Sequence, residues 1–198
     1  MHLTCMKWLE HCRDEYPKHF NDCSVLEMGS LNINGSIRPY FTNCEYIGVD
    51  WINGSTVDVV SLAHKVKFKK KFKTIISSSM LEHDPYWKKS LTNMVKLLAQ
   101  DGGLFLSWGG IGNPPHCLEH SPTGTGFHPL KGSLVFDHLT KVGLYIHEFG
   151  HEDSFMHYLG LGDIDLRIAI NSINLVAFKN RKYAKTKKLI FKLNEDNR

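Results

Sequence analysis

Apolar segments of strand length alternate with amphipathic segments of helix length along most of the chain, and this alternation restricts the fold more than any other feature. Strand-like runs cover residues 24–28, 46–50, 57–60, 74–77, 104–108, 144–149 and 173–178. Helix-like segments cover 3–16, a stretch opened by Asp84-Pro85, and 133–142. Strands alternating with crossovers of helical length indicate a mostly parallel sheet with helices on both faces. We therefore expect an α/β fold: a doubly wound, mostly parallel, seven-stranded sheet.

Length and cysteine content restrict the domain organisation and the compartment. The 198 residues suit one domain with an N-terminal helix in 1–20, a loop at 109–131 and a basic tail at 181–198. The first residues lack the order of a secretory signal, and no apolar run reaches the roughly 20 residues that span a bilayer. The five cysteines are odd in number and have no CxxC spacing. These features predict a cytoplasmic protein that does not bind membranes, and they leave the oligomeric state open.

The segment after the first predicted strand has the composition of a ligand-binding turn. Residues 25–38 read VLEMGSLNINGSIR, in which Gly29 permits a tight turn and close backbone approach. In a doubly wound sheet, ligands bind beside this first turn, at the carboxyl ends of the strands. Asp50 ends the second predicted strand about 20 residues past Gly29, which is the spacing expected for an acid that binds ribose hydroxyls.

The charge at this turn separates two classes of nucleotide cofactor. A dinucleotide site normally carries GxGxxG, and the residues after Gly29 do not complete that pattern. Glu27 lies at the mouth of the turn, where its carboxylate would repel a pyrophosphate. The same carboxylate suits a ligand that carries an ammonium and a sulfonium, because unlike charges attract at short range. The turn therefore favours S-adenosylmethionine.

Four segments, taken in order, resemble the motifs of class I S-adenosylmethionine-dependent methyltransferases. The turn at 25–38 resembles motif I, with Asn-Gly-Ser in place of the usual second glycine, and YIGVD at 46–50 resembles motif II. TIISSSMLEH at 74–83 is similar to the segment after the fourth strand, and LLAQDGGLFL at 97–106 to the segment that enters the fifth. The resemblance runs from about residue 24 to about residue 108 and implies a Rossmann-like fold and methyl transfer.

The resemblance also implies roles for individual residues. Asp50 would accept hydrogen bonds from the ribose, Trp51 would pack against the adenine, and Ala63-His64 would meet the adenine ring. Ser77 and Ser78 would lie beside the sulfonium. The residues implied at the methionine end of the cofactor and in the loop beneath it are Glu27, Gly29, Ser30, Asn34 and Gly35.

The methyl acceptor is expected past the fourth strand. His83 and Glu82 are the candidate bases for the acceptor's proton, and His83 comes first because its unperturbed pKa lies near 6.5. A structural role for His83 at the start of the following helix is the alternative. The loop at 109–131 would cover the acceptor. The acceptor itself stays open among small molecules, sugars, proteins and RNA.

Residues 147–151 read HEFGH and match HExxH, the signature of zinc proteases. That signature works on a helix, whereas Gly143 breaks the preceding helix and the following residues read as a strand. A zinc hydrolase using His147, Glu148 and His151 is therefore an alternative that we do not favour, and we expect no metal. A second possible zinc cluster lies in the long loop: His116, Cys117, His120 and His128.

Lysine runs at 65–73 and near 179–188 account for much of the formal net charge of +4. Such runs are typical either of solvated edges or of surfaces that bind nucleic acid. They support a further alternative, a non-catalytic module with the methyltransferase fold that binds RNA or a partner through its basic patches.

Overall fold

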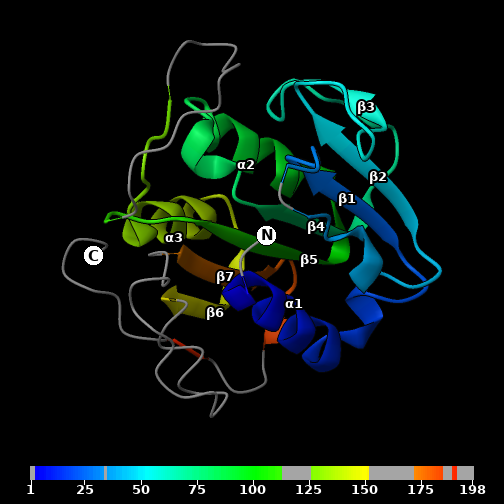
Figure 1. Ribbon diagram of the computed structural model, residues 1–198. Coiled ribbons are helices and arrows are strands. Elements are labelled where there is room, and N and C mark those ends of the chain that lie inside the picture. The colour runs from blue at the N-terminus through cyan, green and yellow to red at the C-terminus, as the bar shows by residue number, and fades with distance from the viewer. Residues whose placement is uncertain (1–2, 34, 113–125, 152–171, 185–188, 191–198) are drawn as a thin grey trace.

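The strands form one continuous sheet in a computed structural model, which describes residues 3–33, 35–112, 126–151, 172–184 and 189–190. The strand order is β3-β2-β1-β4-β5-β7-β6-β8 (Figure 1). β7 runs antiparallel to both of its neighbours, β5 and β6, and every other pair is parallel. The carboxyl ends of β1 to β5 therefore meet at one edge of the sheet.

The element bounds follow the sequence closely. The strands are β1 Ser24–Met28, β2 Glu45–Asp50, β3 Val59–Val60, β4 Phe72–Ser78, β5 Leu98–Gly109, β6 Tyr145–His151, β7 Ser172–Phe178 and β8 Leu189–Ile190. The α-helices in the described part are α1 Leu3–Glu15, α2 Trp87–Leu97 and α3 Gly132–Lys141. Short 3-10 turns are η1 Pro17–His19, η2 Arg38–Tyr40, η3 Leu81–His83 and η4 Arg181–Ala184.

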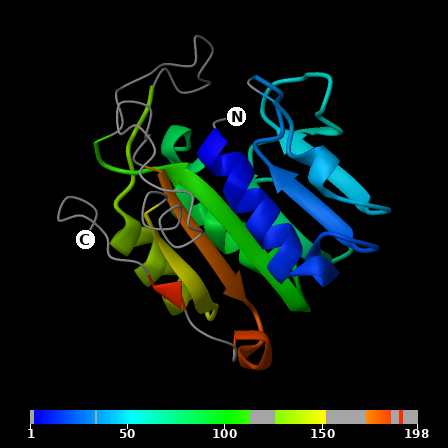
Figure 2. The ribbon, with the colours of Figure 1, turned by 60° about the horizontal axis from the view of Figure 1, so that its bottom comes forward.

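Helices cover both faces of the sheet, as expected, and each face has its own apolar core (Figures 1 and 2). On one face, α1 lies across the middle strands and buries Trp8 and Leu9 against Phe105 and Phe178. On the other face, α2 and α3 pack against the strands. The buried residues that these two helices contribute there include Leu91, Met94, Leu97, Val135 and Leu139.

Two boundaries differ from the sequence-based expectation. The fifth strand was expected at 104–108, but α2 ends at Leu97 and β5 already begins at Leu98. The reason is a bulge: Leu98 pairs with Phe72 and Gly103 with Thr74, so extra residues of β5 fit into the ladder. The seven expected strands are present, and the described residues add an eighth, β8, within the segment expected to be a tail.

The connection from β1 to β2 holds no α-helix in its described residues, 29–33 and 35–44. It contains η2, a single 3-10 turn that begins at Arg38 and includes Pro39. A pyrophosphate-binding fold places the amino terminus of a helix at this point. The structure therefore lacks, in this described connection, the helix that a dinucleotide site would use.

Among the helices of the described segments, none combines the length and apolarity needed to cross a membrane. Among the cysteines that the structure describes, Cys12, Cys23 and Cys44 are free thiols.

Candidate functional site at the carboxyl edge of the sheet

β1 ends in a tight turn that begins at Gly29. Gly29 has a φ of +85°, a region that glycine enters without steric penalty. The N–H groups of Gly29 and Ser30 both donate to the carbonyl of Val49, at 2.8 and 3.1 Å. A Cβ atom added at Gly29 would lie 2.6 Å from the Cβ of Met80. Glycine is required here for two reasons, and the turn leaves bare backbone at the carboxyl edge.

The rest of this loop is fastened to the segment after β2. Ser30 is buried, and its carbonyl accepts a hydrogen bond from the Thr56 hydroxyl. The same hydroxyl oxygen accepts the N–H of Asn32 at 3.0 Å. Gly35, with a φ of +112°, donates its N–H to the Asn32 side chain at 2.9 Å. Asn34, which was assigned to the loop beneath the cofactor, lies outside the described residues.

Asp50 ends β2 beside the first turn and is 8% exposed. Its Oδ2 accepts the N–H of Leu31 at 3.0 Å, and its Oδ1 accepts the N–H of Ile52 at 3.1 Å. A carboxylate has roughly four acceptor positions, so two remain after these bonds. The structure thus brings the predicted ribose-binding acid onto the backbone of the predicted cofactor turn and fixes its orientation.

Glu27 lies within β1, is 5% exposed, and accepts a hydrogen bond from the Tyr46 hydroxyl at 2.7 Å. Burial raises the pKa of Glu27 from 4.5 to about 7, against the lowering effect of that hydrogen bond and of the Arg38 charge. Arg38 lies over the Tyr46 ring at 4.6 Å and pairs with Asp58. The carboxyl is therefore poised to gain its negative charge when a further cation approaches.

The residues predicted for the adenine end lie after β2 and β3. The Trp51 side chain is half-buried at the end of β2. The carbonyl of Ala63 accepts a hydrogen bond from the Asn93 side chain at 2.8 Å, which ties this loop to α2. The His64 ring lies 4.7 Å from the Tyr86 ring.

The three serines at the carboxyl end of β4 differ in burial and in hydrogen bonding. The Ser77 hydroxyl is fully buried and donates to the Met28 carbonyl at 2.7 Å, so it holds β4 to β1. The Ser78 hydroxyl is half-buried and lies at the carboxyl edge. Ser79 has a φ of +53°, a strained conformation for a residue with a Cβ. Its N–H donates to the Ser107 carbonyl at 2.9 Å, so the strain is held by a bond to β5.

Glu82 in η3 is a buried carboxyl between the ends of β4 and β5. It is 2% exposed, and its Oε2 has no hydrogen-bond partner among the described residues. Burial raises its pKa from 4.5 to about 7, although hydrogen bonds from its own N–H and from that of Gly109 act in the opposite direction. A carboxyl with a pKa near neutrality can exchange a proton at physiological pH.

His83, its neighbour, is half-buried and lies with its ring 5.8 Å from that of Phe127. Phe127 belongs to the described end of the loop expected over the acceptor, residues 126–131. The N–H of His128 donates to the Glu82 carbonyl at 2.6 Å, and the N–H of Leu130 donates to the Gly109 carbonyl at 3.2 Å. This end of the loop is therefore fastened over η3. The remainder, 113–125, lies outside the described residues.

The amino-terminal helix reaches the same edge, which the sequence did not indicate. The Cys5 thiol of α1 lies 3.3 Å from the Ser78 hydroxyl, and Cys5 is buried there. Figure 2 shows α1 crossing the sheet with its first turn near the carboxyl ends of the strands. The signal available in the sequence was the apolar stripe of this helix, which predicts burial but not the strand that it covers.

The HEFGH segment lies in β6, a strand, as expected. A register shift between Ile146 and Glu148 places His147 and Glu148 together on the face that α1 covers. Glu148 accepts a hydrogen bond from the Tyr16 hydroxyl and lies 3.2 Å from the His11 ring nitrogen. Desolvation lowers the pKa of His147. These side chains join a helix to the sheet, and the helical geometry required by the zinc-protease interpretation is not present in β6.

The other metal interpretation concerned the long loop. Its members His116, Cys117 and His120 lie outside the described residues. Across the described segments, no group of three or more His, Cys, Asp or Glu side chains is placed to hold a metal ion.

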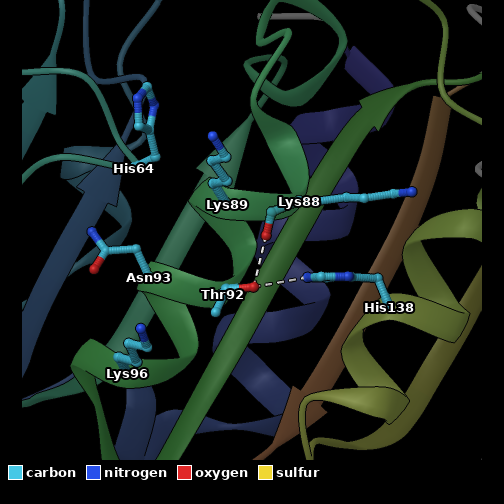
Figure 3. A pocket seen from close by; sticks show the side chains of 7 residues that line it. All are labelled: His64, Lys88, Lys89, Thr92, Asn93, Lys96 and His138. Carbon is cyan, nitrogen blue, oxygen red and sulfur yellow. Dashed lines mark hydrogen bonds between the residues drawn. The ribbon is translucent and has the colours of Figure 1, made fainter.

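A hollow of about 300 Å³ lies along the outer side of α2. Lys89, Asn93 and Lys96 line it from one strip of the helix, and His64 faces them from the loop after β3 (Figure 3). His138 of α3 lies within 3.0 Å of the Thr92 hydroxyl on the other side of the helix. His64 thus both lines the hollow and belongs to the residues predicted for the adenine end of the cofactor.

No protein-family model matches the chain, and no curated protein matches it by sequence. Solved structures share its fold. The 1,6-didemethyltoxoflavin-N1-methyltransferase of Burkholderia thailandensis, solved with 1,6-didemethyltoxoflavin and S-adenosylhomocysteine, is 12% identical with a TM-score of 0.63, over 88% of this chain and 77% of that chain. The N-methyltransferase NodS of Bradyrhizobium japonicum is 14% identical with a TM-score of 0.57, over 88% of this chain and 95% of that chain.

The same fold occurs with another activity. The [4+2]-cyclase SpnF is 12% identical to this chain with a TM-score of 0.59, over 87% of this chain and 80% of that chain. At these identities the comparisons establish the fold: the Rossmann-like α/β fold of class I methyltransferases, as the sequence predicted. A fold does not by itself determine an activity, which has to be argued from the site.

Proposed function

We propose that the chain binds S-adenosylmethionine at the carboxyl edge of β1, β2 and β4 and transfers its methyl group to an acceptor. The observation that carries the proposal is the pairing of a side-chain-free turn at Gly29 with an oriented acid at Asp50. These two features lie on adjacent parallel strands and are joined by the hydrogen bond from Leu31 to Asp50. A nucleoside that lay over the turn would place its ribose hydroxyls within reach of the acceptor positions left on Asp50.

The charge of the site supports a cationic ligand. Glu27 is buried, and its pKa of about 7 means that desolvation penalises its charged form. An ammonium group nearby would stabilise that charge, whereas a pyrophosphate would oppose it. The described part of the β1–β2 connection also offers no α-helix amino terminus to a pyrophosphate. Both observations favour S-adenosylmethionine over a dinucleotide.

Bound S-adenosylmethionine would supply a methyl group already activated by the adjacent sulfonium. The protein then has to orient the acceptor and, when the attacking atom carries a proton, remove that proton. Glu82 suits the second task, since its Oε2 has no partner in the described part of the chain and its pKa of about 7 leaves a substantial fraction able to accept a proton at neutral pH. We assign Glu82 as the proton acceptor and His83 as a residue of the acceptor's surroundings.

Thermal denaturation with two ligands tests this proposal. A ligand that binds the folded state raises the melting temperature by mass action. S-adenosylhomocysteine at about 1 mM is expected to raise the melting temperature, because the free energy of unfolding increases with the logarithm of ligand concentration over dissociation constant. NAD⁺ at the same concentration is expected to leave the melting temperature unchanged. A larger shift with NAD⁺, or no shift with S-adenosylhomocysteine, would overturn the proposal.

A matched pair of glycine variants locates the site. Gly29 and Gly143 both have positive φ, +85° and +92°, so an alanine strains the backbone at either position. A Cβ at Gly143 meets no atom of the described residues within 4 Å, whereas one at Gly29 collides with Met80. Both variants are expected to melt at a lower temperature than the wild type, but only Gly29→Ala is expected to lose the shift produced by S-adenosylhomocysteine. Equal shifts in the two variants would place the ligand elsewhere.

A further inference from the structure

The outer side of α2 carries a concentration of positively charged side chains. The hollow along this helix is lined by Lys88, Lys89, Lys96, Thr92, Asn93, His64 and His138, and none of these side chains is acidic (Figure 3). The loop between β3 and β4 carries further exposed lysines, which extend the charge toward the amino end of β4: Lys65, Lys67 and Lys69. We call the lining residues together with Tyr86 the α2 surface.

The lysines of this surface differ from those around them. Lys70 pairs with Glu45, Lys73 pairs with Asp101, and Lys71 donates to the Lys96 carbonyl at the end of α2. Lys88 and Lys89, by contrast, form no ion pair within the described part of the chain, and neither does Lys96. Their charges are therefore available to an anionic partner.

Aromatic rings accompany these charges at the end of the surface nearest the candidate site. Tyr86 is 42% exposed, its ring lies 4.7 Å from that of His64, and the Lys89 ammonium lies 5.5 Å from the Tyr86 centroid. The Lys88 ammonium likewise lies 5.2 Å from the centroid of Trp87. An exposed ring beside unpaired lysines offers a base a stacking partner and its phosphate a counter-charge.

We propose that the α2 surface binds single-stranded nucleic acid, with phosphates against Lys88, Lys89 and Lys96 and a base stacked on Tyr86. The lysines alone would suit any polyanion, and the exposed ring is what favours nucleic acid over an acidic peptide. α2 spans about 16 Å, so it offers room for a few nucleotides rather than a long duplex. This binding goes beyond methyl transfer and does not require it. The surface begins at Tyr86, three residues after His83, so a bound strand would lead toward the carboxyl edge.

Fluorescence anisotropy with a fluorescein-labelled 12-nucleotide oligouridylate tests the charge component, at KCl concentrations from about 50 to 200 mM. For single strands, the logarithm of the affinity falls with the logarithm of the salt concentration by about 0.7 for each phosphate contact. The triple variant Lys88→Ala, Lys89→Ala, Lys96→Ala is expected to bind at least about 10-fold more weakly at 50 mM KCl, with a slope smaller by about 2. The control variant Lys18→Ala, Arg181→Ala, Lys182→Ala removes three exposed charges elsewhere and is expected to keep most of the affinity.

A second pair of variants tests the aromatic component. Tyr86→Ala is expected to weaken binding by about 5-fold or more without changing the salt slope, because stacking does not involve an ion. Tyr145, which is 44% exposed on β6, supplies the control Tyr145→Ala, expected to bind like the wild type. The melting temperature of each variant and its shift with S-adenosylhomocysteine are measured on the same samples. These two measurements distinguish a loss of nucleic-acid binding from a folding defect and from the absence of a cofactor site.

Three results would overturn the proposal. The first is an absence of oligonucleotide binding by the folded wild-type protein at 50 mM KCl. The second is an equal loss in the two triple variants, which would reflect net charge alone. The third is displacement of the oligonucleotide by polyglutamate of equal charge together with no effect of Tyr86→Ala, which would identify an acidic peptide as the ligand.

Discussion

Replacing the buried carboxyl of Glu82 with an amide should remove a pH-dependent part of the protein's stability. The pKa of Glu82 rises from its ordinary value of 4.5 to about 7 because burial disfavours the charged form. Each pKa unit corresponds to about 1.4 kcal/mol of interaction with the surroundings. Between these two pH values the folded state keeps a proton that the unfolded state has lost, so stability falls as the pH rises. Ionising Glu82 therefore costs the folded state up to about 3 kcal/mol at pH 8.

Urea unfolding at pH 5 and pH 8 measures this quantity. Glu82→Gln cannot ionise, so its loss of stability between the two pH values should be smaller than that of the wild type by about 2 to 3 kcal/mol. Other groups titrate in the same range and persist in both proteins, including His138 and His147, whose pKa values burial lowers. Glu27, with a pKa of about 7, acts in the same direction as Glu82, and His19, with a pKa lowered to about 4, acts in the opposite direction. The difference between variant and wild type isolates Glu82.

The control for this experiment is Glu45→Gln, because the Glu45 side chain is 69% exposed at the start of β2. This variant is expected to keep the wild-type dependence on pH. If Glu82→Gln and the wild type lose the same stability between pH 5 and pH 8, then Glu82 is not a carboxyl of raised pKa. Its assignment as the proton acceptor would then lose its basis.

Three further variants test individual contacts. Ser77→Ala removes the buried hydrogen bond to the Met28 carbonyl and should lower the free energy of unfolding by about 1 to 3 kcal/mol, measured by urea unfolding. Tyr16→Phe removes the hydroxyl that donates to the buried Glu148 and should be destabilising by a similar amount, about 1 to 3 kcal/mol, whereas Tyr145→Phe should have no effect. His147→Ala should leave the zinc content after dialysis unchanged, because the motif lies in a strand; stoichiometric zinc that this variant loses would restore the hydrolase interpretation.

The half of the sheet that forms the candidate site could be predicted well from the sequence. The buried parallel strands β1, β2 and β4 appear in the sequence as short, continuous apolar runs. Each run ends at or just before a glycine or a polar residue. Gly29 and Asp50 could be placed at neighbouring strand ends because both the fold and the spacing point there. Their contact through Leu31 follows from the parallel pairing of β1 and β2.

Contacts between distant parts of the chain could not be predicted. The position of Cys5 over Ser78 joins residues 73 apart, and the contact between Tyr16 and Glu148 joins residues 132 apart. An apolar stripe predicts that a helix is buried but does not identify the strand that it covers. The burial of Glu82 could not be predicted either, because a short 3-10 turn at the edge of the sheet leaves no periodic apolar pattern in the sequence.

The bulges escaped prediction for a related reason. The extra residues at the start of β5 and the register shift in β6 depend on how each strand fits its neighbour, not on the residues of one strand alone. The shift in β6 has a chemical consequence, because it places His147 and Glu148 on one face. A regular strand would have separated them by the alternation of side chains.

The most direct test of the proposed function is calorimetric titration of the purified protein with S-adenosylhomocysteine. We predict micromolar binding that Asp50→Ala weakens by roughly 10-fold or more, on the scale of lost hydrogen bonds to a charged group. Asp50→Asn keeps the side-chain volume and is included in case the alanine variant does not fold. Asp137→Ala, at an exposed position of α3, should bind like the wild type. Binding that depends on Asp50 would establish the cofactor site, and an absence of binding by the folded wild-type protein would contradict it.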